Sequence, residues 1–82
     1  MSVLLKPITT EKAIRAIEIE NKIMFIVDRR ATKAEIIKDI KDKFKVKVSK
    51  VNVHLRKNEK IAIIKLKADT PAIDIATKLG MI

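Results

Sequence analysis

Cysteine is absent from this 82-residue chain, and glycine and histidine each occur once, at Gly80 and His54. Without cysteine the chain forms neither disulfides nor thiolate metal sites, and thiol catalysis is excluded. One glycine near the C-terminus cannot build a glycine-rich phosphate loop. A lone imidazole, among acids that are interleaved with lysines, makes no cluster of metal ligands. We therefore expect no enzyme activity, no metal, no cofactor and no small-molecule ligand.

Aromatic residues are scarce, since Trp and Tyr are absent and the two phenylalanines are Phe25 and Phe44. Both lie at positions that the apolar pattern assigns to the core, so base stacking of the kind used by RRM and OB domains is not expected. Long apolar runs are also missing. Residues 23–27 and 61–64 are the longest, far short of the ~20 residues of a membrane span.

The N-terminus carries no signal-peptide pattern, and the length allows a single domain. We therefore expect residues 1–82 to form one small, soluble, intracellular domain that does not insert into membranes.

Positive charge is in excess and is unevenly distributed. The chain has 19 Lys and Arg against 10 Asp and Glu, a formal net charge of +9. Residues 1–40 carry +2, residues 41–67 carry +8 and residues 68–82 carry −1. A concentrated positive field attracts polyanions, which makes nucleic acid the leading partner class. Two alternatives stay open: a lysine-rich surface that meets only solvent, and a free-standing adaptor whose basic face binds an acidic protein.

The first half of the chain predicts three elements. A short strand is expected over residues 3–6, followed by a helix over 11–19 that either Thr9 or Thr10 caps. A strand is expected over residues 23–28, and its positions 23–27 are apolar without interruption, which is typical of a strand covered on both faces. We expect this strand to be central in the sheet.

A second helix is predicted to begin at a capping box. Thr32 and Glu35 have the required spacing, and the apolar face continues to about Phe44. Asp39 and Lys43 are expected on the solvent side of this helix, as an acid-to-base pair four residues apart.

A β-hairpin follows in the most basic segment. Residues 46–56 and 61–67 have strand patterns, and a phase change in the first of them predicts either a bulge or a late start of the strand near Ser49. The connection is short, and Asn58 tolerates the left-handed conformation it could require.

A last short helix is expected to be capped by Thr70, with Pro71 at its first position and Gly80 after its end. The whole pattern gives β-α-β-α-β-β-α. The fold class is therefore α+β, with an antiparallel sheet of about four strands and helices packed on its faces.

Alternation in the hairpin points Lys50, Asn52, His54 and Arg56 to one face of a strand, at steps of about 6.6–7 Å. This spacing is close to that of phosphates along a nucleic-acid strand. We therefore expect recognition of the backbone of a folded RNA, with Asn52 and His54 on sugars or base edges; an ordinary solvated strand remains the alternative. The other basic candidates in this segment are Lys47, Lys57 and Lys65.

Several short blocks, in order, resemble the universal large-subunit ribosomal protein L twenty-three family, and the last of them resembles its archaeal type. The blocks are Leu5-Lys6-Pro7, Thr10-Glu11-Lys12-Ala13, residues 31–36, residues 44–48, residues 51–53 and residues 75–80.

This resemblance implies a ribonucleoprotein component of the large ribosomal subunit, active in translation in the cytoplasm. It implies binding to domain III of the large-subunit rRNA at the polypeptide exit tunnel, beside neighbouring ribosomal proteins. It also implies docking of signal recognition particle, translocon and nascent-chain chaperones through Glu11. Among RNA-binding residues, Lys33, Asn52 and Lys60 match the family's contacts most directly. The connection over residues 56–60 is shorter than the bacterial extension into the tunnel, so a tunnel-probing role is not expected.

Overall fold

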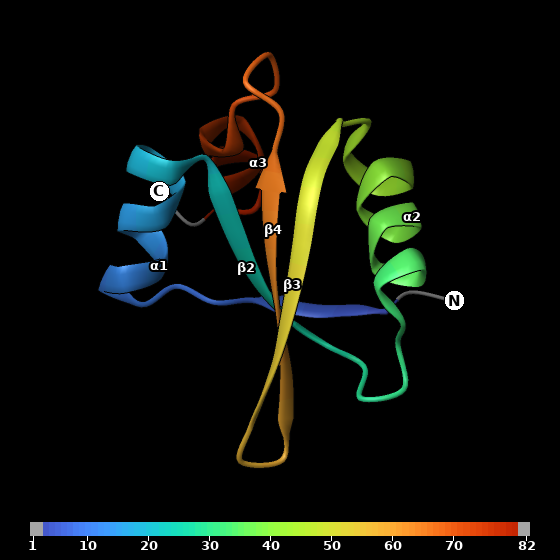
Figure 1. Cartoon of the computed structure of the whole chain (residues 1–82). Helices are drawn as coiled ribbons and strands as arrows, with labels where there is room; N and C mark the ends of the chain where they lie inside the picture. The colour runs from blue at the N-terminus through green and yellow to red at the C-terminus, as the bar shows by residue number, and fades with distance from the viewer. Residues whose placement is uncertain (1–2, 81–82) are drawn as a thin grey trace.

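The computed structural model of the chain describes residues 3–80. Within this range four strands form one antiparallel sheet in the order β1-β2-β4-β3, accompanied by three α-helices (Figure 1). The predicted element order and the α+β class are confirmed. The elements are β1 (Leu4–Pro7), α1 (Glu11–Arg15), η1 (Ala16–Glu20), β2 (Lys22–Val27), α2 (Lys33–Phe44), β3 (Val48–Arg56), β4 (Glu59–Leu66) and α3 (Ala72–Lys78).

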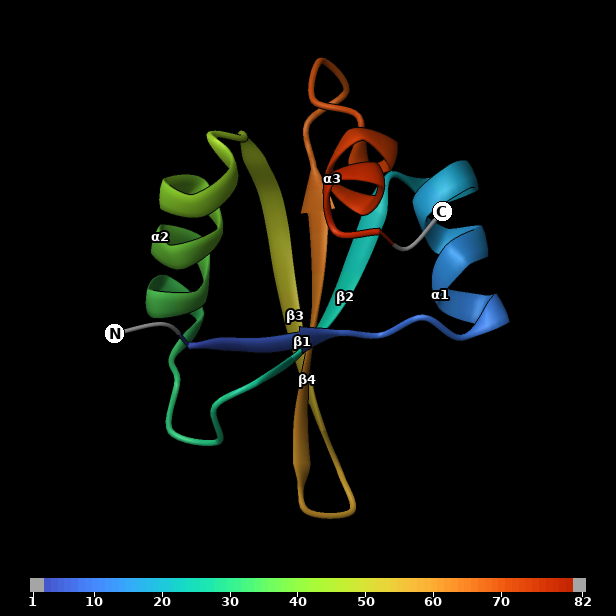
Figure 2. The ribbon, with the colours of Figure 1, turned by 180° about the vertical axis from the view of Figure 1, so that it is seen from behind.

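The hydrophobic core lies between the helices and one face of the sheet. Ile23, Phe25 and Val27 of β2 are buried, and they join one cluster with the buried side chains of β4, α2 and α3. Met24 and Ile26, which point to the opposite face, are only half-buried. The expectation that this central strand is covered on both sides is wrong for the second face. Figure 1 shows the sheet in front of α3, and Figure 2 shows α3 in front of the sheet.

The first helix begins at Glu11 and is capped by Thr10, whose Oγ1 accepts a hydrogen bond of 3.2 Å from the backbone N–H of Ala13. Thr10, and not Thr9, is therefore the cap. The helix is α-helical only to Arg15 and continues as the π-helical turn η1, where an α-helix to Ile19 was expected. The backbone N–H of Asn21 donates to the carbonyl of Ala16, five residues earlier, which is the π-helical spacing.

The second helix agrees with its prediction at both ends, and its capping box is fully formed. The predicted ion pair is also present, with Lys43 Nζ 3.5 Å from Asp39 Oδ2. Asp39 does not face solvent, however, since its side chain is only 15% exposed. Its Oδ2 accepts hydrogen bonds of 3.0 and 3.1 Å from the backbone N–H groups of Val3 and Leu4. This carboxylate therefore joins α2 to the start of β1.

The hairpin of β3 and β4 has the bulge, one of the two alternatives predicted near Ser49, because the register shifts between Val48 and Lys50. Arg56 pairs with Glu59 across a two-residue turn. Lys57, and not Asn58, takes the left-handed conformation of this turn, with φ 47°. The end of the hairpin that carries this turn reaches past the end of β2, as the lower part of Figure 1 shows.

The third helix begins at Ala72, and its N-cap is Pro71. The prediction that Thr70 caps this helix, with Pro71 at its first position, is wrong by one residue. The backbone N–H of Ala72 instead donates to Oδ1 of Asn21 at 2.6 Å. Gly80 follows the helix with φ 73°, the left-handed position predicted for the only glycine in the sequence.

Candidate nucleic-acid interface

The face of the sheet opposite the core is the candidate interface, and we call it the open face. Strand alternation and register assign its members, since directly paired residues of antiparallel strands point the same way. Its rim is largely basic and its centre is apolar. The open face comprises Lys6, Lys22, Met24, Ile26, Lys50, Asn52, His54, Arg56, Glu59, Ile61, Ile63 and Lys65.

Three lysines stand side by side across one end of the open face. Lys65 of β4 pairs with Lys22 on one side and with Lys50 on the other. Like charges directly opposite each other on a sheet repel, which destabilises the fold. One carboxylate offsets part of this charge, since Glu20 Oε1 lies 3.4 Å from Lys22 Nζ. The row, which we call the lysine row, is an arrangement that a bound polyanion would stabilise.

The strand row expected from the sequence is also present. Lys50, Asn52, His54 and Arg56 share the open face along β3, and Asn52 alone among them is half-buried. The lysine row and the β3 row meet at Lys50. The basic groups therefore border the open face on two adjoining sides, and they do not form a single line.

A shallow hollow of about 260 Å³ lies inside this border. Its floor is apolar, made mainly by Met24, Ile61 and Ile63, all half-buried. Its rim carries nitrogen-bearing side chains from two distant parts of the chain. The residues that line it are Ile8, Thr10, Lys12, Met24, His54, Arg56, Ile61 and Ile63.

Lys60 was predicted as an RNA contact, but the structure turns it to the helix side of the sheet. It pairs with Val27 and Leu55, on the same side as the core residues. Its Nζ donates a hydrogen bond of 2.6 Å to the carbonyl of Ala31. Lys33 is exposed at the first position of α2, next to the 28–32 loop. Neither residue belongs to the open face.

Lys47 and Lys57 also lie outside the open face. Lys57 is exposed in the hairpin turn. Lys47 precedes β3, and its Nζ lies 3.1 Å from Oδ2 of Asp69. The hydrogen bond and the charge of Lys47 lower the pKa of the Asp69 carboxyl below its ordinary value. Of the nine predicted RNA-binding residues, the structure brings together Lys50, Asn52, His54, Arg56 and Lys65.

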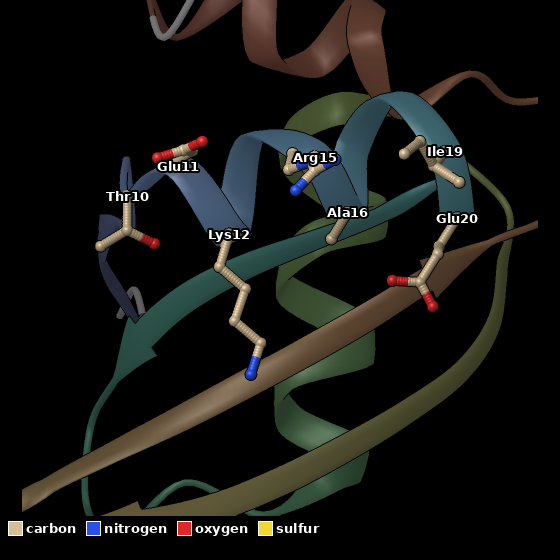
Figure 3. A pocket seen from close by; sticks show the side chains of 7 residues that line it. All are labelled: Thr10, Glu11, Lys12, Arg15, Ala16, Ile19 and Glu20. Carbon is tan, nitrogen blue, oxygen red and sulfur yellow. The ribbon is translucent and has the colours of Figure 1, made fainter.

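Three basic residues of this site, Lys6, Lys12 and Lys22, were missed in the sequence. Lys22 directly precedes the apolar run of residues 23–27. In a strand it points to the face opposite Ile23, Phe25 and Val27, and this alternation is the signal that could have assigned it to the open face. Lys12 projects from α1 away from Glu11 (Figure 3) and reaches the rim of the hollow. No local signal could have found Lys12, because its place depends on how α1 packs beside the sheet.

The exposed side of the first helix forms a second candidate surface. Glu11, Arg15 and Ile19 follow one another at four-residue spacing, and together with Lys12 they line an open groove along the helix (Figure 3). All three are exposed, and Ile19 has 75% of its surface accessible. We call Glu11, Arg15 and Ile19 the outer α1 stripe.

Within residues 3–80, no three His, Asp or Glu side chains gather in a way that could hold a metal ion. None of the helices described is long and apolar enough to cross a membrane. An uncovered sheet face with a largely basic rim attracts polyanions, and nucleic acid is one such partner.

Comparison with known proteins identifies the family. The model of the family described as "Ribosomal protein L23" matches residues 2–71. The large ribosomal subunit protein uL23 of Picrophilus torridus is 42% identical over 81 residues, which cover 99% of each chain. The chain belongs to the ribosomal protein L23 family, and the archaeal resemblance is confirmed. It is thus a structural component of the large ribosomal subunit, a ribonucleoprotein that acts in translation in the cytoplasm, with rRNA and ribosomal proteins as partners.

Proposed function

We propose that the open face binds domain III of the large-subunit rRNA beside the polypeptide exit tunnel. The lysine row is the observation that carries this proposal. Lys22, Lys65 and Lys50 repel one another in the free protein, and neutralisation by phosphates removes that cost. Family membership supports rRNA as the polyanion, which disfavours the alternative of a free-standing adaptor for an acidic protein.

Phosphate contacts position the protein, and the polar groups of β3 add contacts to sugars or base edges. Lys50, Lys65 and Arg56 contact phosphates, while Asn52 and His54 lie between them and reach the ribose edge. Lys33, Lys47 and Lys57 lie outside the open face and make peripheral phosphate contacts. Lys60 acts within the fold, because its ammonium group already binds the carbonyl of Ala31. Residues 1–82 function as one rRNA-binding unit.

The outer α1 stripe is proposed as part of the docking site for signal recognition particle, the translocon and nascent-chain chaperones. Glu11 offers a carboxylate, Arg15 a guanidinium and Ile19 an exposed apolar side chain on the same side of the helix. This mixture of an exposed apolar side chain with charged neighbours is typical of an interface. The stripe and the open face are made of different residues, and they adjoin at Thr10 and Lys12, which line both the groove and the hollow.

Chemical footprinting of intact large subunits tests the rRNA assignment. Subunits that contain the protein should show backbone protection in domain III, and subunits reconstituted without it should lose that protection. A matched reconstitution with the variant Lys38→Ala, which removes an exposed lysine on α2, controls for loss of charge elsewhere. Protection in another rRNA domain would overturn the assignment. Release of the protein by a high-salt wash that leaves its neighbours bound would instead favour an adaptor.

A further inference from the structure

The hollow on the open face has a use that phosphate binding does not explain. A surface that contacted only phosphates would need cations and no apolar floor. Here Met24, Ile61 and Ile63 leave apolar area uncovered at the centre of a basic face. Uncovered apolar surface rimmed by polar groups marks a binding site, so the occupant carries an apolar part as well as negative charge.

The size of the hollow restricts the occupant. Ligand sites that enclose drug-sized molecules have volumes of about 300–1,000 Å³, and this hollow, at about 260 Å³, is smaller. A helix or strand of a partner protein would not enter it. A single flat ring system would, with its faces against the isoleucines and the thioether of Met24, since methionine sulfur makes favourable contacts with aromatic rings.

The charges on the rim identify the rest of the occupant. Lys12 approaches from α1, while His54 and Arg56 approach from β3. Lysine and arginine side chains on two sides of an apolar floor suit a nucleotide, whose flat base is attached to a ribose that carries a phosphate on each side. The combination of a flat apolar group with negative charge on both sides thus favours a nucleotide within an RNA chain over an acidic peptide.

We propose that the hollow receives one extruded nucleobase of the bound rRNA, with its flanking phosphates on Lys12 and Arg56. This inference rests on the proposed rRNA-binding function and adds a base-binding site to it. The base is held by aliphatic and thioether contacts and does not stack on a protein aromatic, which agrees with the absence of Trp and Tyr. An unpaired or bulged nucleotide fits best, because extrusion then costs least.

Photo-crosslinking from the floor of the hollow tests the proposal. The protein is prepared with a diazirine analogue of methionine, bound to a transcript of rRNA domain III, irradiated and mapped by reverse-transcription stops. We expect one dominant crosslinked nucleotide. The matched control is Met24→Leu. It removes the photoreactive group from the hollow and leaves the groups at the other two methionines, Met1 and Met81, in place. In that variant the dominant stop should disappear.

Affinity gives a second measurement that does not depend on crosslinking. The double variant Ile61→Ala, Ile63→Ala should lower affinity for the transcript about ten-fold, the scale of one lost base contact. Its salt dependence should stay unchanged, because no phosphate contact is lost. Ile73→Ala, which truncates an exposed isoleucine on α3, should leave affinity unchanged. Thermal unfolding of each variant checks that the fold is retained.

The outcomes separate the two proposals. If the transcript binds with the expected salt dependence but crosslinks are spread over many nucleotides, the base site is wrong and rRNA binding stands. The same holds if the affinity of the double variant is unchanged. A dominant crosslink to a protein in intact subunits would make the hollow a protein contact and also overturn the base site. If the transcript does not bind at all, both proposals fall.

Discussion

The side-chain oxygen of Asn21 accepts a hydrogen bond of 2.6 Å from the backbone N–H of Ala72, 51 positions later in the chain. Its side-chain nitrogen donates to the carbonyls of Leu66, Lys67 and Thr70 at 3.1–3.3 Å. Asn21 thereby joins the end of the first helix to the end of β4 and the start of α3. It also adopts φ 56°, a conformation that asparagine tolerates better than most residues.

Replacement of Asn21 tests this junction. Asn21→Ala should lower the free energy of unfolding by about 2–4 kcal/mol. The variant loses several hydrogen bonds, and it leaves an alanine, which cannot form them, in the left-handed region. Asn21→Gly should recover roughly 1 kcal/mol of that loss, because glycine adopts positive φ freely. Urea unfolding measures both. A loss below about 0.5 kcal/mol for Asn21→Ala would mean that the hydrogen bonds add nothing beyond hydration.

Asp39 offers a second stability test, because its carboxylate accepts hydrogen bonds from Val3 and Leu4 and pairs with Lys43. Asp39→Ala should destabilise the protein by about 1–3 kcal/mol through the unsatisfied N–H groups at the start of β1. Asp42→Ala is the control, since Asp42 is exposed on the same helix and should change stability by less than about 0.5 kcal/mol. Equal effects of the two variants would show that Asp39 does not hold β1.

Local signals explain why much of the fold was predictable. The capping box of α2, the irregularity near Ser49 and the position of Gly80 each depend on a few neighbouring residues, and each was predicted correctly. The role of Asn21 has no local signal in the sequence, because its partners lie 45–51 positions away. The π-helical turn before it could not be read from the sequence either, since its residues fit an α-helix equally well.

The candidate site was predictable along β3 and less so on β4. Alternation of polar and apolar residues showed which side of β3 faces away from the core. In β4 the run Ile61 to Ile64 is apolar on both faces. The sequence alone therefore does not show which alternate residues of this strand point to the core. Pairing with β2 and β3 decides this, and it places Lys65 on the open face and Lys60 on the helix side.

Lys65 and Lys60 should therefore respond differently to truncation. Lys65→Ala should reduce the salt slope of rRNA binding by roughly 0.7–0.9, the share of one phosphate contact. It should also leave the free protein as stable or slightly more stable, because repulsion by Lys22 and Lys50 is relieved. Binding titrations at several salt concentrations, with urea unfolding alongside, measure both effects.

Lys60→Ala serves as the matched comparison on the same strand. It should leave the salt slope unchanged and lower stability by about 0.5–1.5 kcal/mol, since it removes the hydrogen bond to the Ala31 carbonyl. A slope change as large as that of Lys65→Ala would mean that the Lys60 ammonium leaves Ala31 and contacts a phosphate in the complex.

The pair of Lys47 and Asp69 predicts a pH dependence. Because Lys47 lowers the pKa of Asp69, the pair contributes its stabilisation above the ordinary pKa of the carboxyl and loses it as pH falls through the lowered value. Both groups are largely exposed, so the effect on overall stability is small and the pKa itself is the useful readout. NMR titration should show the Asp69 pKa rising in Lys47→Ala. An unchanged value would mean that the pair does not persist in solution.

Glu11 lies on the outer α1 stripe, and its charge can be reversed without touching the open face. Glu11→Lys should leave rRNA affinity and its salt slope nearly unchanged, because Glu11 points away from Lys12 and the hollow (Figure 3). Binding of signal recognition particle to reconstituted large subunits should weaken about ten-fold or more. The lysine would face a positive charge of the partner where the glutamate faced it before, and like charges across an interface repel. Sedimentation of the particle with the subunits measures this.

Glu11→Gln separates charge from helix stability in the same assay. Glu11 is in the first turn of α1, where a negative charge favours the helix N-terminus by about 0.3–1 kcal/mol. If Glu11 acts only on the helix, both variants should lower the unfolding temperature and leave particle binding intact. If it acts at the interface, Glu11→Gln should weaken binding less than Glu11→Lys at comparable stability. A collapse of rRNA binding in either variant would show instead that α1 supports the open face.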